Sequence, residues 1–285
     1  MYRKKGTEDE YSVYYGCSAQ EVCEKYVKNE RCYSKIVFIL TIVSLVFYII
    51  LLNANRNECI LLLLFDVVLL YSRRINSIRK VRHMEKILSA DCDPVKLLQV
   101  FEYAETTCES GKKVENFLKI RCCRLATGKS EDGFAELMSY NSSKLVWNYE
   151  VVRLSEIINY AFIMNNRDVF MQAKKELEEL PSRIRKHNKK EEKTYNQVMK
   201  QVRLKELFWD EHNEEARQLA KELMQIEKTR YNKVFTYMLL AQLDLRENNY
   251  ESAKEYLEFV IEQGNTLFLV DDAKKLLEEI KAIWK

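Results

Sequence analysis

The sequence predicts an all-α protein in which a two-helix transmembrane hairpin precedes an array of helical hairpins. Only 6 glycines and 2 prolines occur in 285 residues, and 31% of the residues are charged. Few helix breakers and many charges favour long helices with solvated faces. From about residue 84 onward, apolar residues recur at helical intervals, and no alternating segment is long enough to seed a sheet. A single concentrated apolar region lies near the N-terminus.

Bulk composition excludes several classes of protein. Apolar residues make up 47% of the chain and aromatic residues 11%, which is enough material for a core and argues against general disorder. The net charge of +3 arises from 46 basic and 43 acidic residues, so there is no general case for nucleic-acid binding. A chain of this length has room for about two domains.

Residues 36–52 form an unbroken apolar run that predicts a first transmembrane helix. At about 1.5 Å per residue, this run nearly crosses a hydrocarbon core roughly 30 Å thick. Tyr33 and Lys35 extend the span into the interface. Some 35 residues precede the run and no small-residue cleavage site follows it, so it does not resemble a signal peptide. The alternative is a buried core helix.

The second apolar run, residues 59–72, is shorter and contains Asp66, so its length alone also fits a re-entrant or core segment. A helix that starts near Ala54 reaches about nineteen residues, enough for a second span. Basic residues flank the two runs on their outer sides, and only Arg56 lies between them. The positive-inside rule therefore predicts a multi-pass protein of the cell membrane with both termini in the cytoplasm and residues 53–58 as an outer turn.

The predicted organisation has four parts. They are a cytoplasmic juxtamembrane segment (1–32), the transmembrane hairpin (33–74), leading helices (75–115) and helical repeats that end in a capping helix (116–285). Basic residues just inside the membrane are expected to attract anionic headgroups, at about 1 kcal/mol each. These are Arg73, Arg74, Arg79, Lys80 and Arg82. The composition, poor in glycine and rich in Lys, Asn, Glu and Tyr, is typical of an AT-rich bacterium.

Asp66 and the eight cysteines are the reactive side chains with a candidate functional role. Asp66 would be an ion or proton relay, or a carboxyl that hydrogen-bonds between the helices. The second interpretation is favoured because no second ionisable residue is predicted to be buried in the spans as its partner. Seven of the eight cysteines fall in predicted cytoplasmic regions, where disulfides are not expected. Their spacings match no zinc pattern, so no metal site is predicted.

Several helix boundaries carry recognisable signals. Asp93 followed by Pro94 predicts a helix start with an N-cap. Asp271 and Asp272 suit the first turn of the last helix, where the helix dipole favours negative charge. Gly264 is expected to end the preceding helix in a left-handed conformation.

Small residues recur on both sides of predicted turns. Ala241 and Ala253 lie twelve residues apart around Asn248-Asn249, which predicts two antiparallel helices in close approach. The same frame recurs as Ala161 and Ala173 around Asn165-Asn166. Two weaker copies pair Cys123 with Ala135 and Leu204 with Ala216. A generic helical bundle with chance alanine matches is the alternative.

A repeated helix–turn–helix unit of this kind resembles the tetratricopeptide repeat superfamily over residues 116–285. The last unit carries the resemblance best, with Tyr237, Leu240, Ala241, Tyr250, Ala253 and Leu257 at the family's characteristic positions. The spacing of the second-helix alanines, 37 to 43 residues, exceeds the usual 34, and most of the family's glycines and prolines are missing. These departures leave the repeat register open.

The resemblance implies a concave surface, formed mainly by the first helix of each pair, that binds a peptide or protein partner. Carried onto this chain, that surface would consist of Ile158, Phe162, Asn165, Gln201, Lys205, Phe208, Met238 and Gln242. Their mixture of apolar, amide and basic groups suits an extended or helical peptide. Packing between repeats is the alternative for each of them. Membrane lipids are expected partners, whereas nucleic acids and small-molecule substrates are not.

No catalytic motif was found, and neither an enzymatic activity nor a cofactor is predicted. Gly128-Lys129-Ser130 hints at a phosphate loop, but the first glycine of that motif is replaced by Cys123. The three histidines are scattered, and the basic stretch 183–193 reads as a solvated linker. The sequence thus predicts a membrane-anchored interaction scaffold. The alternatives are a sensory or regulatory subunit of a membrane complex that signals through the hairpin, and an enzyme without a recognisable motif.

Overall fold

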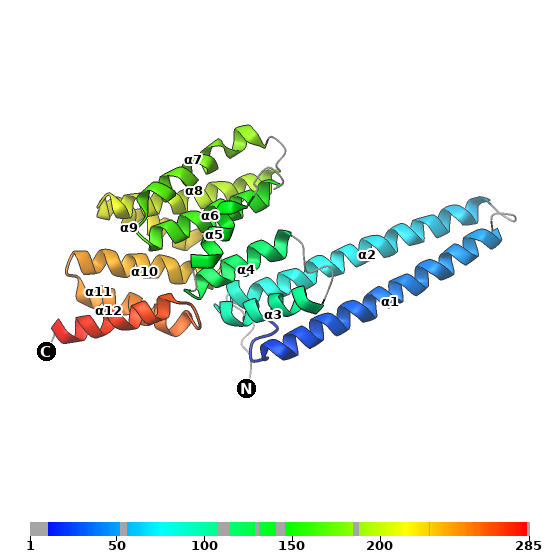
Figure 1. The fold of residues 1–285 in the computed structure, drawn as a ribbon, viewed down its shortest axis with the longest axis horizontal. Helices are drawn as coiled ribbons and strands as arrows, with labels where there is room; N and C mark the ends of the chain where they lie inside the picture. Colours follow the sequence, from blue (N-terminus) through cyan, green and yellow to red (C-terminus); the bar gives the residue numbers. More distant parts are fainter. Residues whose placement is uncertain are drawn as a thin grey trace. The chain divides into compact units, whose positions relative to one another are not determined.

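The computed structural model describes residues 11–51, 56–107, 114–128, 131–140, 146–184, 188–227 and 229–283. Within these ranges the chain is helical and contains no β-strand, so the all-α prediction is confirmed (Figure 1). The chain divides into two compact units. The N-terminal unit is Ser12–Lys86, and the C-terminal unit consists mainly of Ile87–Lys285. The C-terminal unit therefore includes most of the predicted leading helices (75–115) as well as the predicted repeats (116–285).

The N-terminal unit consists of two long antiparallel helices, α1 (Ala19–Leu51) and most of α2 (Arg56–Ser89) (Figure 1). Two polar contacts join them. The hydroxyls of Tyr33 and Ser72 lie 2.9 Å apart, and the Ser44 hydroxyl donates a hydrogen bond of 3.0 Å to Asp66. This second bond matches the interhelical role favoured for Asp66 above.

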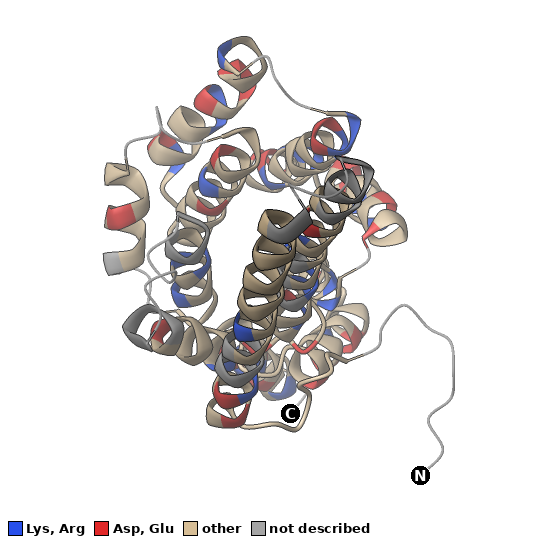
Figure 2. Ribbon diagram, turned by 90° about the vertical axis from the view of Figure 1, so that its right-hand side faces the viewer, with Lys and Arg blue, Asp and Glu red and all other residues tan. Residues whose placement is uncertain are grey.

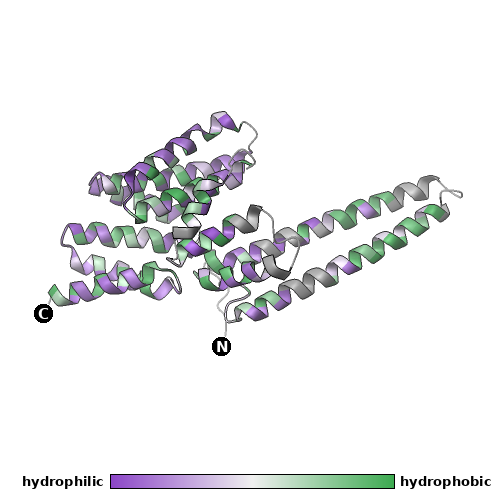
Figure 3. Cartoon of the chain, in the orientation of Figure 1, coloured by the Kyte–Doolittle hydropathy of each residue, from purple (hydrophilic) through white to green (hydrophobic). Residues whose placement is uncertain are grey.

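The outer surface of both helices is apolar. Many large apolar side chains on α1 between Ile36 and Ile49, and on α2 between Leu63 and Tyr71, are more than a third exposed (Figure 3). Among the described residues, one stretch, Cys32–Ile49 in α1, is long and apolar enough to cross a bilayer, and only 11% of it is buried. The second predicted span begins at residues 54–55, which lie outside the described residues.

The C-terminal unit is built from helices that pack as consecutive antiparallel neighbours. Its main pairs are α6 with α7, α8 with α9, and α10 with α11, and α12 packs against α11. The bounds are α3 (Pro94–Thr107), α4 (Val114–Ala126), α5 (Glu131–Ser139), α6 (Trp147–Ile163), α7 (Arg167–Arg183), α8 (Lys189–Trp209), α9 (Asn213–Ile226), α10 (Arg230–Arg246), α11 (Tyr250–Gln263) and α12 (Leu269–Ile283).

The three main pairs turn in the same way. Asn165, Glu211 and Asn248 end the first helices with φ angles of 52°, 59° and 59°, in the left-handed region. The next residue in each turn donates its backbone N–H to a carbonyl five residues earlier, at 2.8, 3.0 and 2.8 Å. Such bonds satisfy carbonyls that the helix end would otherwise leave unpaired. The chain therefore reverses within two or three residues.

These turns fix the register of the pairs and correct one predicted frame. Leu204 and Ala241 both lie seven residues before their left-handed residue, but Ala161 lies only four before Asn165. The residue equivalent to Ala241 is therefore Ile158, about one helical turn away. Ala161 and Ala173 are nevertheless buried, because residues one turn apart lie on the same helix face.

The pairing of Cys123 with Ala135 is wrong. Cys123 is fully buried in α4, but Ala135 is exposed on α5. Among the described side chains of that short helix, Leu137 is buried and belongs to the core around α6 and α7. A match of small residues at the right spacing therefore did not identify the buried face of α5.

The predicted helix starts at Pro94 and near Asp271 are confirmed. Asp93 accepts a hydrogen bond of 3.0 Å from the Lys96 backbone N–H, and both Asp271 and Asp272 lie in the first turn of α12. Gly264 ends α11, but its φ of −77° is right-handed, and Asn265 adopts the left-handed conformation instead. Gly264 is needed for space, because a Cβ there would lie 2.5 Å from the Val260 carbonyl oxygen.

The basic stretch 183–193 is only partly a linker. α7 continues through Pro181 to Arg183, and α8 begins at Lys189, so part of the stretch is helical. Asn188 caps α8 by accepting bonds from the backbone of Lys190 and Glu191, and the Glu191 side chain accepts one in return. Residues 185–187 lie outside the described ranges.

The two ends of the C-terminal unit meet at a hydrogen-bonded junction, defined here as residues 91–93 and 265–268. The Asn265 side chain donates to the Asp91 carbonyl at 2.9 Å, and the Thr266 hydroxyl donates to the Asp93 carboxylate at 2.9 Å. The backbone of Thr266 bonds the Cys92 carbonyl, and the backbone of Phe268 bonds the carbonyl of Ala126. The start of α12 is thereby held against segments more than 140 residues earlier in the chain.

We expect Gly264→Ala to lower the free energy of unfolding by about 1–3 kcal/mol, the usual cost of overpacking. The added Cβ would meet the Val260 carbonyl and the Val270 side chain, each at 2.5 Å. Gly133→Ala is the matched control, because its nearest neighbour atom would lie 3.6 Å away in α5. It should be neutral or stabilise by up to about 1 kcal/mol. Urea unfolding followed by circular dichroism measures both, and equal losses would contradict the packing argument.

Candidate functional site

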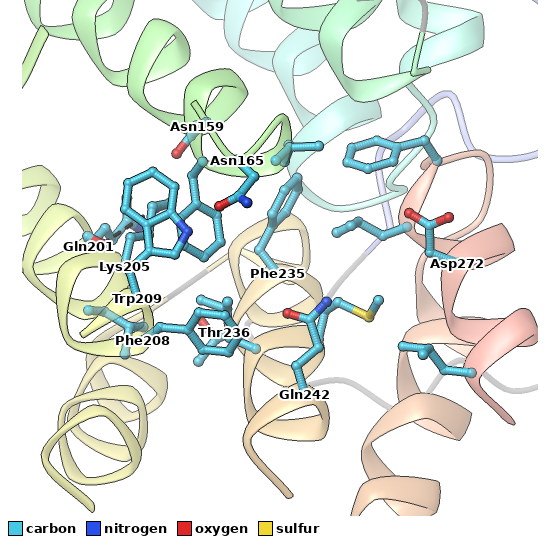
Figure 4. A pocket seen from close by; sticks show the side chains of 18 of the residues that line it. Asn159, Asn165, Gln201, Lys205, Phe208, Trp209, Phe235, Thr236, Gln242 and Asp272 are labelled. Carbon is cyan, nitrogen blue, oxygen red and sulfur yellow. Dashed lines mark hydrogen bonds between the residues drawn. The ribbon is translucent and has the colours of Figure 1, made fainter. Parts of the chain in front are cut away.

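One cavity of about 600 Å³ lies within the C-terminal unit. Its wall is formed by α6, α8, α10 and α12, which are the first helices of the three main pairs and the last helix (Figure 4). Cavities of 300–1,000 Å³ that mix apolar walls with a few polar groups are typical ligand sites.

Seven of the eight residues predicted for partner binding line this cavity. They are Phe162, Asn165, Gln201, Lys205, Phe208, Met238 and Gln242. Ile158 does not, because it is fully buried in the core shared by α6 and α7. It lies at the level where α10 places Ala241, so it fills the helix crossing and leaves no side-chain atoms for a ligand.

Aromatic side chains dominate one part of the cavity. The Phe162 ring lies 5.6 Å from Phe208 and 5.0 Å from Trp209, measured between ring centroids. Phe235 lies 4.9 Å from Tyr231 and 6.4 Å from Phe268. Tilted and edge-on pairs at these distances stabilise one another. The rings thus form a preorganised apolar surface across α6, α8, α10 and the start of α12.

Two of the cationic groups on the wall are already engaged. The Arg246 guanidinium lies 3.8 Å from the centre of the Phe208 ring and donates a hydrogen bond of 2.7 Å to the Phe208 carbonyl. Lys275 lies 3.6 Å from the Asp272 carboxylate on α12. Arg246 therefore fixes the position of Phe208 and is not free to bind a ligand.

Lys205 is different, because its ammonium makes no ion pair within 4 Å among the described residues. It is half-buried in the cavity wall and donates only a long bond of 3.4 Å to the Gln201 carbonyl. Burial lowers the pKa of Lys205 to about 8, and the negative charges of Glu156 and Glu227 offset part of this effect.

Two carboxylates lie behind the polar wall. Burial raises the pKa of Glu156 to about 7, and this rise is partly offset by the charge of Lys205 and a hydrogen bond from Asn159. Glu227 accepts bonds of 3.0 Å from the Gln201 amide and 3.1 Å from the Thr236 hydroxyl. Glu227 is thus satisfied by neutral donors, whereas the charge of Lys205 is the largest influence that stabilises the charged form of Glu156.

Sequence reasoning missed Glu156, Glu227 and the contribution of α12. Glu156 lies in α6, three residues before Asn159, but on a different side of the helix from the predicted residues Ile158 and Phe162, so helical periodicity contained no signal for it. Glu227 lies in the connection before α10, and Asp272 and Leu276 lie on the predicted capping helix. Nothing in their local sequence distinguishes them from ordinary surface residues.

The remaining candidate groups are metal ligands, cysteine thiols and surface cations. No cluster of three or more metal-ligating side chains occurs among the described residues. Burial raises the pKa of Cys92 to about 12 and that of Cys123 still higher, so neither thiol is a ready nucleophile. Of the predicted membrane-surface cations, Arg74, Arg79 and Arg82 are exposed on α2, and the side chains of Arg73 and Lys80 lie outside the described set. Lys and Arg are interspersed with Asp and Glu on the helices of the C-terminal unit (Figure 2).

Comparison with protein families, curated proteins and solved structures found no match for this chain.

The raised pKa of Glu156 predicts a pH dependence of stability. A carboxyl whose pKa rises on folding binds its proton more tightly in the folded state, so its stabilising effect is full below about pH 4.5 and declines up to about pH 7. We therefore expect Glu156→Gln to gain about 1–2 kcal/mol relative to the wild type between pH 5 and pH 7.5.

Urea unfolding at the two pH values measures this difference. Glu255→Gln, an exposed position on α11, is the control and should show no such gain. If the stability difference between wild type and Glu156→Gln is the same at both pH values, the assigned role of burial at Glu156 is wrong.

Proposed function

We propose that this protein is a membrane-anchored scaffold whose C-terminal unit docks a segment of a partner protein in the cavity of α6, α8, α10 and α12. The N-terminal unit would be the anchor, a two-span hairpin with both termini in the cytoplasm. The C-terminal unit would act as an array of helical hairpins similar to tetratricopeptide repeats.

The exposed apolar surface of α1 and α2 supports the anchor. Exposed apolar side chains such as Phe38, Val67 and Val68, which are 61–66% exposed, would be unfavourable in water over so long a surface. Lipid would cover them. Basic residues on the outer flanks of both runs support a hairpin whose two ends lie on the cytoplasmic side of the membrane. The Ser44–Asp66 hydrogen bond supports an interhelical role for Asp66, in which the polar group is shielded from lipid.

The cavity is the observation that carries the docking proposal. It combines a volume of about 600 Å³, a preorganised aromatic surface and polar groups that converge from four helices. Each first helix contributes to it, which is the geometry by which stacked hairpins bind peptides. The alternative is a regulatory subunit that signals through the hairpin and binds its partner in the same cavity. Among the described residues, the hydrogen bond of Asp66 is to Ser44 on the neighbouring helix, which does not favour that alternative.

We expect reporters fused to the two termini to lie on the same, cytoplasmic side of the membrane. Two spans return the chain to its starting side, whereas one span places the termini on opposite sides. Paired phosphatase and fluorescent-protein fusions at Met1 and Lys285 measure this directly. Opposite sides would show that α1 alone crosses the bilayer. Release of the whole chain by alkaline carbonate would show that neither helix does.

We expect Lys205→Met to reduce the amount of partner that copurifies with the detergent-solubilised protein by about tenfold. The substitution keeps an apolar stem but removes the cavity cation that makes neither an ion pair nor a cation–π contact among the described residues. Lys221→Met, on the exposed face of α9, is the control and should copurify the partner at the wild-type level. Equal capture by both variants would remove the cavity from the docking proposal.

A further inference from the structure

We propose that the docked segment is an extended peptide without net charge, whose main-chain groups are hydrogen-bonded by side-chain amides of the cavity and whose apolar side chains contact its aromatic surface. This inference rests on the proposed docking function and specifies the chemistry of the partner.

Side-chain amides are the most numerous polar groups on the wall. Five of them line the cavity: Asn159 on α6, Asn165 in the turn after α6, Gln201 on α8, and Asn232 and Gln242 on α10. Figure 4 labels all of these except Asn232. Within the described part of the chain, the amides of Asn165, Asn232 and Gln242 have no hydrogen-bond partner. Each offers two donors and one acceptor, which match the carbonyl and N–H of a peptide group.

The cavity wall and the layer behind it carry charges of both signs. The cations are Lys205, Arg246 and Lys275, and the carboxylates at or directly behind the wall are Glu156, Glu227, Asp272 and Glu279. Arg246 and Lys275 are engaged within the protein, and Lys205 lies in the field of Glu156 and Glu227. An acidic ligand would be repelled by these two carboxylates and a basic ligand by Lys205, so a dipolar but uncharged ligand fits best.

The apolar part of the cavity supplies the remaining contacts. Phe235, Met238, Leu269 and Leu276 come from α10 and α12, whereas Asn159 and Gln201 come from α6 and α8. An extended chain directs successive side chains to opposite faces, so one set can enter this part while the main chain remains near the amides. A helical peptide would satisfy its own backbone groups and leave the amides unused.

The test uses the full chain in nanodiscs of uncharged lipid, panned against a phage library of random twelve-residue peptides. Empty nanodiscs serve for counter-selection. We expect enriched peptides with a shared apolar pattern and no net charge, whose Kd changes less than twofold between 50 and 500 mM NaCl because no ion pair is screened. Fluorescence polarisation of the synthetic peptides measures the Kd.

Backbone recognition is tested from both sides of the contact. Gln242→Met should weaken binding about five- to tenfold, as should N-methylation of the peptide groups nearest the amides. Gln225→Met, on the exposed face of α9, is the matched control and should bind as the wild type does. The N-methylated peptides test the same contact without any change to the protein.

The outcomes separate the two proposals. A charged consensus with strong salt dependence, or an uncharged one that tolerates N-methylation at every position, would overturn this inference but leave a docking scaffold in place. If no peptide is enriched over empty nanodiscs, the docking function itself is overturned.

Discussion

The arrangement of the cavity depends on the junction between residues 91–93 and 265–268. Stacked helical hairpins need contact only their neighbours, and an open stack would leave α12 free at one end. Here four hydrogen bonds tie the start of α12 to segments near the beginning of the same unit. The left-handed conformations of Cys92 and Asn265 direct both chain segments into this contact. With α12 fixed in this way, Asp272 and Leu276 line the same cavity as α6 and α8.

Several polar groups at the cavity already have partners within the protein. Glu227 is buried, yet it is satisfied by Gln201 and Thr236, and Arg246 both stacks on Phe208 and bonds its carbonyl. Elsewhere in the unit, buried charges are paired directly, as Arg153 is with Glu150 at 2.9 Å. Lys205 is the exception. Its lowered pKa and lack of an ion pair among the described residues mark the position where a ligand changes the electrostatic balance most.

The helical pairs show how similar turns accommodate different packing. The turn residues Asn165 and Glu211 are 46 residues apart, whereas Glu211 and Asn248 are 37 apart, because α7 and α8 and the connection between them are longer than α9, α10 and their connection. Where α10 and α11 use Ala241 and Ala253, α6 and α7 use Ile158 and the larger Phe170, whose ring packs 4.7 Å from Trp209. Bulk at this crossing is therefore compensated by the neighbouring pair, and the pairs need not share one sequence pattern.

The sequence alone determined the helical class and several helix boundaries. These properties depend on local spacing, since the 3.6-residue period and the capping residues act within one or two turns. The resemblance to tetratricopeptide repeats, carried onto these helices, also predicted that Phe162, Gln201, Lys205 and Gln242 form one surface, and all four line the cavity.

Only the tertiary structure decided the rest. Ile158 shares its helix face with the site but is buried at a crossing, Ala135 is exposed despite its matching spacing, and Gly264 is required by a close contact with Val260 and Val270. Glu227 and Asp272 reach the cavity because of the junction and the helix stacking. Such contacts join residues far apart in the chain, and their free energy depends on which side chains meet, which no local pattern specifies.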